Sequence, residues 1–162
     1  DAFVRRLLQD IYDRMFTALE LAAATGETPL EALTQAIRVI AHFGRAHRHL
    51  LRRIIADAMD GQPIAIEFLR TNLPRHFSVI VALIGTAQDA GCLRRLPIAQ
   101  AVAFVAGAVG APIVFGSGFA EGDLANPAVA TTFAADVLSD PAIDERIGLA
   151  LAALATVSEA GA

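Results

Sequence analysis

The sequence predicts an all-α protein, a bundle of about seven helices in one domain that spans residues 1–162. Alanine, the strongest helix former, occupies 34 of the 162 positions. Apolar residues recur at intervals of three and four, and no alternating apolar and polar run with a hairpin turn occurs. Hydrophobic residues make up 55% and charged residues 19% of the chain, which excludes a disordered polymer.

The first two helices are marked by their apolar periodicity and by residues typical of helix ends. Six apolar residues at helical spacing predict a helix over residues 3–21: Phe3, Leu7, Leu8, Ile11, Met15 and Leu19. We expect it to stop near Gly26, where glycine supplies a C-terminal cap. Thr28 and Pro29 are typical of an N-cap and a first helical position, so a second helix is expected from there to Gly44.

The third and fourth helices are expected on either side of a short glycine-containing turn. Residues 45–59 form the third helix, and Pro63 begins a fourth that runs to Gly91. Pro74 lies inside the fourth helix. It should kink the helix there, because proline has no N–H to donate and its ring crowds the carbonyl of Arg70.

The fifth helix carries no charged residue from Pro97 to Ala120, and its apolar residues cover the whole circumference. We expect such a helix to be buried all round, against the core on one side and a second subunit on the other. A stripe of small residues would let two copies approach closely: Ala99, Ala103, Ala106 and Gly110. The alternative is a membrane span, since these 24 residues exceed the about 20 that a span needs. Pro112, Gln100 in the first turn and the lack of a second such segment favour the subunit interface.

Two further helices are each introduced by a cap residue followed by proline, at Asn126 and at Asp140. We expect the last helix, residues 141–158, to pack beside the 97–115 helix across a two-fold axis, which gives a homodimer with a four-helix interface. Larger side chains on the last helix would surround this contact: Ile143, Ile147, Leu151 and Leu154.

Charge is unevenly distributed along the chain, whose net charge is −4. Residues 1–95 hold 12 arginines and 10 acidic residues, whereas residues 96–162 hold one arginine and seven acidic residues. Because the acidic part repels a phosphate backbone, these residues are not expected to bind nucleic acid by themselves. The single cysteine, Cys92, excludes an internal disulfide framework and fits a reducing cytoplasm.

No group of residues forms a catalytic or metal-binding pattern. The densest polar cluster is His42, Arg45, His47, Arg48, His49, Arg52 and Arg53. Its histidines lack the i, i+4 spacing of a zinc site, so we interpret it as a solvated helix face with one or two histidines turned inward. Gly116, Ser117 and Gly118, followed by Gly122, are similar to a dinucleotide fingerprint, but no strand precedes them and we expect a flexible loop. The sequence therefore predicts no enzyme, no metal and no cofactor.

The expected kink at Pro74 is flanked by the polar residues Asn72, Arg75 and His76. In one interpretation these residues are surface polar groups, or hydrogen-bond to the carbonyl that the proline leaves free. In the other they belong to a cavity that the kink opens between the 2–24, 29–43 and 63–90 helices. In the second interpretation the ligand-binding residues are Met15, Leu19, Ile40, Phe43, Phe68, Asn72, His76, Phe77 and Phe104. The alternative is that the aromatic residues are plain core.

Four short motifs follow one another over residues 45–115. They are Leu50-Leu51-Arg52-Arg53, then Gly61-Gln62-Pro63, then Ala90-Gly91-Cys92-Leu93-Arg94, and finally Leu96-Pro97 before an alanine-rich helix. This order resembles the C-terminal ligand-binding and dimerisation domain of TetR-family transcriptional regulators. The junction of Gly, Leu and Arg followed by Leu-Pro carries most of the resemblance.

The resemblance implies a homodimeric regulator, expected to be a repressor released from DNA by a small, mostly apolar effector. We expect the protein to be cytoplasmic and without membrane contact. Residues 2–24 would be the connecting helix, and the helix-turn-helix headpiece that binds DNA is expected upstream, outside this sequence. The alternative is a stand-alone helical dimerisation or adaptor module without a ligand.

Overall fold

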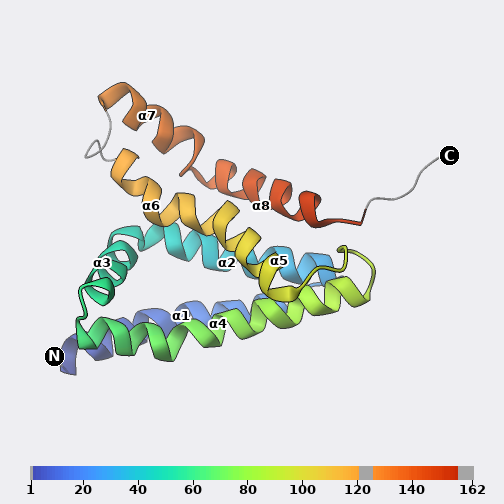
Figure 1. The fold of residues 1–162 in the computed structure, drawn as a ribbon, viewed down its shortest axis with the longest axis horizontal. Coiled ribbons are helices and arrows are strands. Elements are labelled where there is room, and N and C mark those ends of the chain that lie inside the picture. The colour runs from blue at the N-terminus through green and yellow to red at the C-terminus, as the bar shows by residue number, and fades with distance from the viewer. Residues whose placement is uncertain (1, 121–125, 157–162) are drawn as a thin grey trace.

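The computed structural model describes residues 2–120 and 126–156 and confirms an all-α helical bundle (Figure 1). Its elements are α1 (Ala2–Thr25), α2 (Pro29–Ala46), α3 (Arg48–Met59), α4 (Pro63–Asp89), α5 (Ile98–Val105), the π-helical turn η1 (Ala106–Gly110), α6 (Ala111–Ala120), α7 (Pro127–Asp136) and α8 (Asp140–Leu154). Because α5, η1 and α6 follow one another without a break, we refer to them together as the 98–120 rod.

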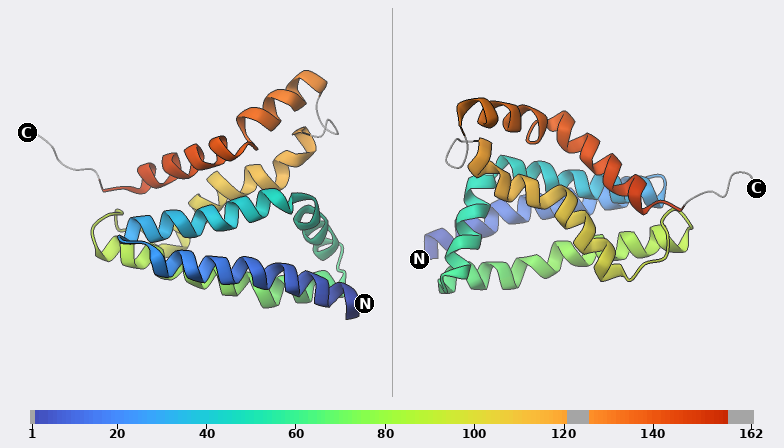
Figure 2. Two further views of the ribbon diagram at one scale, coloured as in Figure 1. Left: turned by 180° about the vertical axis from the view of Figure 1, so that it is seen from behind. Right: turned by 45° about the horizontal axis from the view of Figure 1, so that its top comes forward.

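The helices pack around a shared core. α1 and α4 lie side by side, α2 packs on both, and α3 joins α2 to α4 at the end where the N-terminus lies (Figures 1 and 2). The 98–120 rod contacts α2, α3 and α4, while α8 runs back over α2 and the rod. Residues far apart in the chain, on α1, α4 and the rod, therefore contribute to one core.

Helix starts follow the predicted caps at two of three places. The Thr28 hydroxyl accepts a hydrogen bond from the Glu31 N–H at 3.1 Å, and the Asn126 side chain accepts one from the Val129 N–H at 3.0 Å. The cap of α8 is Ser139, not Asp140, so that prediction was wrong by one residue. An N-cap residue has an extended backbone, and its side-chain oxygen accepts a hydrogen bond from an N–H of the first turn. Ser139 is extended and accepts from the Ala142 N–H.

The predicted role of Gly26 was also wrong. Among the described residues only Gly61 and Gly91 have positive φ, so Gly26 does not end α1 with a left-handed cap. A side chain at Gly26 would instead collide with the backbone of Ala32 in the first turns of α2. Glycine is required at this corner because the two helices approach so closely.

The 98–120 rod is not buried all round. Val105, Val109 and Ile113 face the core, whereas Ala99 and Ala103 are exposed. Among the described residues, this is the one helix long and apolar enough to cross a membrane by length and composition, and 22% of its most apolar window is buried. The core of the chain thus covers one side of the rod, and the side on which a second subunit is expected is uncovered in a single chain. The subunit contact stays a prediction.

The glycine-containing segment that was expected to be a flexible loop is helical. Gly116, Ser117 and Gly118 lie within α6, while Gly122 lies outside the described residues. A side chain at position 116 would come within 2.5 Å of the Phe133 ring on α7. Glycine at this position thus permits α7 to pack closely on α6, an effect that local sequence patterns do not reveal.

The last helix is used by the chain's own core. Four of its residues, expected around a subunit contact, are at most 6% exposed: Ile143, Ile147, Leu151 and Leu154. They pack against α2 and the 98–120 rod, so the sequence-based assignment of Ile147, Leu151 and Leu154 to an interface was wrong. The helix ends at Leu154, short of the predicted residue 158, and residues 157 and 158 lie outside the described part of the chain.

Candidate functional site

A cavity of about 340 Å³ lies between α1, α2, α3, α4 and the 98–120 rod. Its volume falls in the range of small-molecule pockets, about 300–1,000 Å³. The sequence predicted a space among the first, second and fourth helices. α3 and the rod also line it, a contribution that sequence reasoning missed because it depends on how distant helices pack.

The wall of the cavity is almost entirely apolar. Among the described residues that line it, none is Asp, Glu, Lys or Arg. Four polar side chains interrupt the apolar surface: Tyr12, His47, Asn72 and His76. Such a wall suits an uncharged ligand, because a buried ion without a partner is strongly unfavourable.

Seven of the nine predicted ligand-binding residues line this cavity: Met15, Ile40, Phe43, Phe68, Asn72, His76 and Phe77. Leu19 does not, because it is fully buried in the core of the bundle. Phe104 does not either, since it is 43% exposed. Helical periodicity turns it away from Val102 and Val105, the α5 residues that do line the cavity.

Ala106 and Gly110, which were predicted to lie at the subunit interface, line the cavity. Ala106 and Gly110 both belong to η1, the π-helical turn. Such turns are frequent at functional sites, because the extra residue changes which side chains face inward. Ala106 is exposed as well, so this part of the wall lies close to the surface.

α4 continues without a break through Pro74, so the expected kink does not divide it (Figure 1). The polar residues around it join α4 to α1. The side-chain amides of Gln9 and Asn72 bond reciprocally at 3.1 and 3.2 Å. Asn72 also donates to the carbonyl of Phe68 at 3.0 Å and is only 2% exposed. Its hydrogen-bonding groups are therefore already occupied by the protein.

An arginine on α4 strengthens the same junction. The Arg75 guanidinium donates to the Asp13 carboxylate at 2.8 Å, and this bond is the main reason that the pKa of Asp13 lies below its usual value. The guanidinium also lies over the Phe16 ring, 4.2 Å from its centre. Arg75 thus holds α1 by an ion pair and a cation–π contact outside the cavity.

Tyr12 and His76 form the polar part of the wall itself. The Tyr12 hydroxyl donates to the carbonyl of Asn72 at 2.7 Å and lies 3.0 Å from Nδ1 of His76. Burial lowers the pKa of His76 below its usual value, and burial also raises the pKa of Tyr12. Both side chains are therefore neutral near pH 7.

His47 is the polar side chain on the α2 side of the cavity. Its ring packs on Phe43 with the centroids 4.5 Å apart. It is one of the histidines of the arginine-rich cluster, and it turns inward as the sequence predicted.

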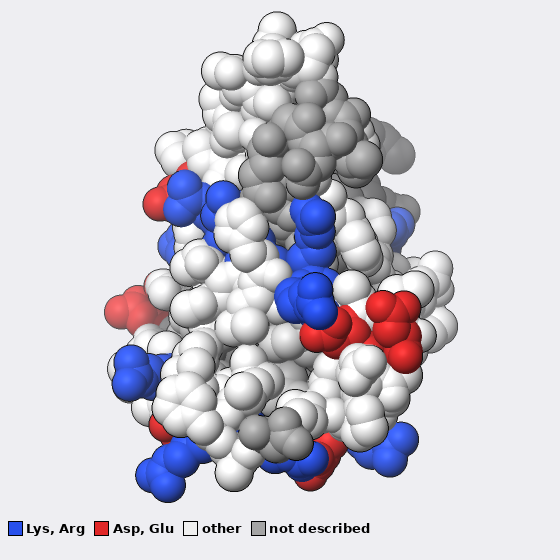
Figure 3. All heavy atoms as spheres, turned by 90° about the vertical axis from the view of Figure 1, so that its left-hand side faces the viewer, with Lys and Arg blue, Asp and Glu red and all other residues white. Residues whose placement is uncertain are grey.

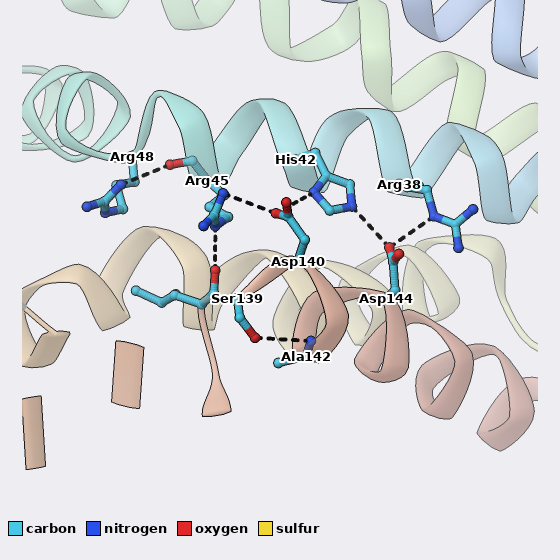
Figure 4. A network of polar contacts seen from close by, with 9 residues as sticks. Arg38, His42, Arg45, Arg48, Ser139, Asp140, Ala142 and Asp144 are labelled. Carbon is cyan, nitrogen blue, oxygen red and sulfur yellow. Dashed lines mark hydrogen bonds and ion pairs between the residues drawn. The ribbon is translucent and has the colours of Figure 1, made fainter. Parts of the chain in front are cut away.

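The rest of that cluster is less solvated than predicted, because part of it forms a clamp to α8 (Figure 4). His42 lies between two carboxylates, with Nδ1 3.2 Å from Asp140 and Nε2 3.0 Å from Asp144. Arg38 donates to Asp144 at 2.9 Å, and Arg45 pairs with Asp140 at 3.1 Å. The hydrogen bond from His42 is the first reason that the pKa of Asp144 lies below its usual value.

The remaining arginines of this region lie at the α3 end of the molecule. Figure 3 shows basic side chains over the middle and lower part of this end, beneath an upper part where the described residues of α6 and α7 are largely uncharged. Within the described residues, no three His, Cys, Asp or Glu side chains come together to hold a metal ion.

In the comparisons with known proteins, no family model, no curated protein and no solved structure matches the chain. The likeness to TetR-family regulators therefore depends on the motifs of residues 45–115.

Proposed function

We propose that this chain is the effector-binding and dimerisation domain of a ligand-responsive transcriptional regulator of the TetR type, a repressor released from DNA by a small, mostly apolar molecule. The observation that carries the proposal is the cavity of about 340 Å³ with an uncharged wall. In this proposal the protein is not an enzyme and needs no cofactor, and it acts in the cytoplasm.

The position of α1 supports a link between the cavity and DNA. This helix supplies Leu8, Ile11, Tyr12 and Met15 to the wall and is also the proposed connecting helix. A molecule that fits best when α1 is displaced favours the displaced state by its differential affinity. In a dimer, such a displacement changes the spacing of two recognition helices, which must match half-sites about one DNA turn apart. DNA contact belongs to the helix-turn-helix unit that this proposal joins to α1.

A two-fold contact on the exposed face of the 98–120 rod is the second part of the proposal. Ala99 and Ala103 are exposed, and so are the larger Phe104 and Phe115 at 43% and 63%. The neighbouring α8 exposes Leu149 at 65%. Monomers rarely tolerate contiguous apolar patches, so a second copy is the occupant that we propose.

The alternative is a dimerisation or adaptor module that binds no ligand. A filled core would favour it. The presence of a cavity bounded by five segments of the chain favours a ligand-binding domain instead, because an empty space of this size lowers stability without some compensating use.

The experiment is binding of a neutral fluorescent probe, N-phenyl-1-naphthylamine, to the purified protein and two matched variants. Gly110 lines the cavity and Gly107 does not, yet both lie in η1 with open space where a side chain would begin. We expect Gly110→Leu to weaken binding at least about tenfold by filling the cavity, while Gly107→Leu binds like the wild type.

Circular dichroism establishes that both variants are folded. A wild type that binds no probe, or two variants that bind it equally well, would overturn the proposed ligand cavity.

A further inference from the structure

The polar groups of the cavity wall differ in what they still offer to a ligand. The Asn72 amide is occupied by Gln9, Phe68 and Arg75. The Tyr12 hydroxyl has one proton, and it donates that proton to the carbonyl of Asn72, since a carbonyl oxygen only accepts. Neither side chain has a free donor for a ligand.

The hydrogen bond from Tyr12 also fixes where the proton of the His76 ring lies. With its proton directed at Asn72, the Tyr12 oxygen can only accept from the imidazole nitrogen 3.0 Å away. Nδ1 of the neutral ring therefore carries the hydrogen, and Nε2 carries a lone pair. Within the described residues, Nε2 has no hydrogen-bond partner. Because His76 lines the cavity and its Nδ1 is directed at Tyr12, Nε2 is the ring nitrogen left to interact with a ligand, as an acceptor and not as a donor.

We propose that the cavity selects uncharged, mostly apolar molecules that carry a hydroxyl group, with the hydroxyl donating a hydrogen bond to Nε2 of His76. This inference rests on the proposed function of the cavity and adds the chemical class of its ligand. An aromatic alcohol fits particularly well, because the Phe77 ring lies tilted beside the His76 ring, with the centroids 4.8 Å apart, and Phe68 lines the same wall.

The physical basis of the selection is the cost of an unpaired polar group. A hydroxyl that leaves water loses its hydrogen bonds and regains one at Nε2, whereas an ether of the same shape leaves Nε2 without a donor. Sites built to hydrogen-bond a hydroxyl reject analogues that lack it for this reason. A carboxylate or an amine is excluded instead by desolvation, because the lining side chains that the structure describes include no charge to pair with it.

His47 does not make the same selection. No hydrogen bond to the described residues fixes which of its ring nitrogens carries the proton, so it can act as a donor or as an acceptor. It provides a matched control within the same cavity.

The test compares 2-naphthol with 2-methoxynaphthalene, which share an apolar body but differ in the hydroxyl donor. Affinities are measured by calorimetry at pH 7.5, where naphthol is neutral. We expect the wild type to prefer naphthol by about tenfold more than His76→Leu does, with the preference retained in His47→Leu. Tyr12→Phe should change the preference less than His76→Leu does, since the carbonyl of Asn72 stays beside the His76 ring and can accept its hydrogen.

The outcomes separate this inference from the proposed function. If the wild type and His76→Leu bind both compounds with the same preference, the assignment of Nε2 is wrong, although the ligand cavity stands. If neither compound nor N-phenyl-1-naphthylamine binds the wild type, the cavity itself is not a ligand site and both proposals fail. Thermal unfolding of each variant verifies that it is folded. If His76→Leu does not fold, His76→Phe, which keeps an aromatic ring without the Nε2 acceptor, replaces it as the decisive variant.

Discussion

The hydroxyl of Tyr12 on α1 donates to the backbone carbonyl of Asn72 on α4 at 2.7 Å, two residues before Pro74. The residues are 60 positions apart in the chain and meet in the wall of the cavity. This bond ties the proposed connecting helix to the longest helix of the bundle. A ligand that contacts His76 lies next to it, since His76 shares the Tyr12 oxygen.

Removal of this hydroxyl should destabilise the protein. We expect Tyr12→Phe to lower the free energy of unfolding by about 1–3 kcal/mol, because the carbonyl of Asn72 and Nδ1 of His76 lose a buried partner. Urea denaturation followed by circular dichroism measures the change. Thr17→Ala serves as a control, since it removes an exposed hydroxyl on α1. Equal effects of the two substitutions would contradict a stabilising role for the buried hydrogen bond between Tyr12 and Asn72.

His76 should make stability depend on pH below neutrality. Its pKa is lowered in the folded protein by burial, so the unfolded chain binds a proton more readily. The stability linked to His76 is therefore complete above the unfolded pKa of about 6.5 and is lost as the pH falls through that value towards the folded pKa. We expect the urea midpoint of the wild type to fall more than that of His76→Leu between pH 7.5 and 5. Parallel pH profiles would show that His76 is not the group responsible.

The stability that the polar contacts between α2 and α8 contribute should depend on salt concentration. Asp144 accepts from both His42 and Arg38, and its side chain is 38% exposed. We expect Asp144→Asn to cost about 1 kcal/mol at low ionic strength and less in 1 M NaCl, because partly exposed pairs are screened. Since the pKa of Asp144 is lowered in the folded protein, its contribution is present above the unfolded pKa and declines below about pH 4. Asp136→Asn, an exposed change on α7, should have no such effect.

Replacement by alanine should change the stability of the protein in opposite directions at two glycines of the 98–120 rod. Gly107→Ala is expected to stabilise the helix by up to about 1 kcal/mol, since nothing lies where its side chain would begin. Gly116→Ala should destabilise the protein, because the Phe133 ring lies 2.5 Å from that position and must move from its stacking on Phe119. Thermal unfolding compares the two variants. A gain in stability from Gly116→Ala would contradict the tight packing of α6 against α7.

The oligomeric state tests whether a second copy of the chain covers the exposed face of the 98–120 rod. Sedimentation at micromolar concentration should show a dimer for the wild type and a monomer for Ala103→Arg, because a buried unpaired charge is strongly unfavourable. Ala24→Arg on the exposed side of α1 is the matched control and should remain dimeric. A soluble monomeric wild type, or dimerisation of Ala103→Arg at unchanged strength, would rule out this interface.

Most of the helices, and several of their starting residues, could be predicted from local chemistry. Thr28 followed by Pro29, and Asn126 followed by Pro127, specify helix starts through a side-chain acceptor and a preset backbone angle, both of which act within one turn. Periodicity likewise identified α4 and the apolar character of the 98–120 rod. These features depend on residues that are neighbours in the chain.

The partners of each apolar face were decided only by tertiary packing. Leu151 on α8 is as apolar as a subunit contact requires, yet α2 and the 98–120 rod bury it within the same chain. His42 belongs to the cluster that the sequence predicted as a solvated helix face, yet α8 places two carboxylates beside it. Periodicity specifies that a face must be buried, but the neighbour that buries it comes from a distant segment.

The residues that line the cavity were determined partly by local sequence and partly by tertiary packing. Phe68, His76 and Phe77 could be assigned to it from the residues around Pro74, because they share one stretch of a single helix. The contribution of α3 and η1 could not, since a void exists only where five separate segments fail to fill the space between them. The tautomer of His76 depends in turn on a hydroxyl from α1, a contact 64 residues away that only the folded chain creates.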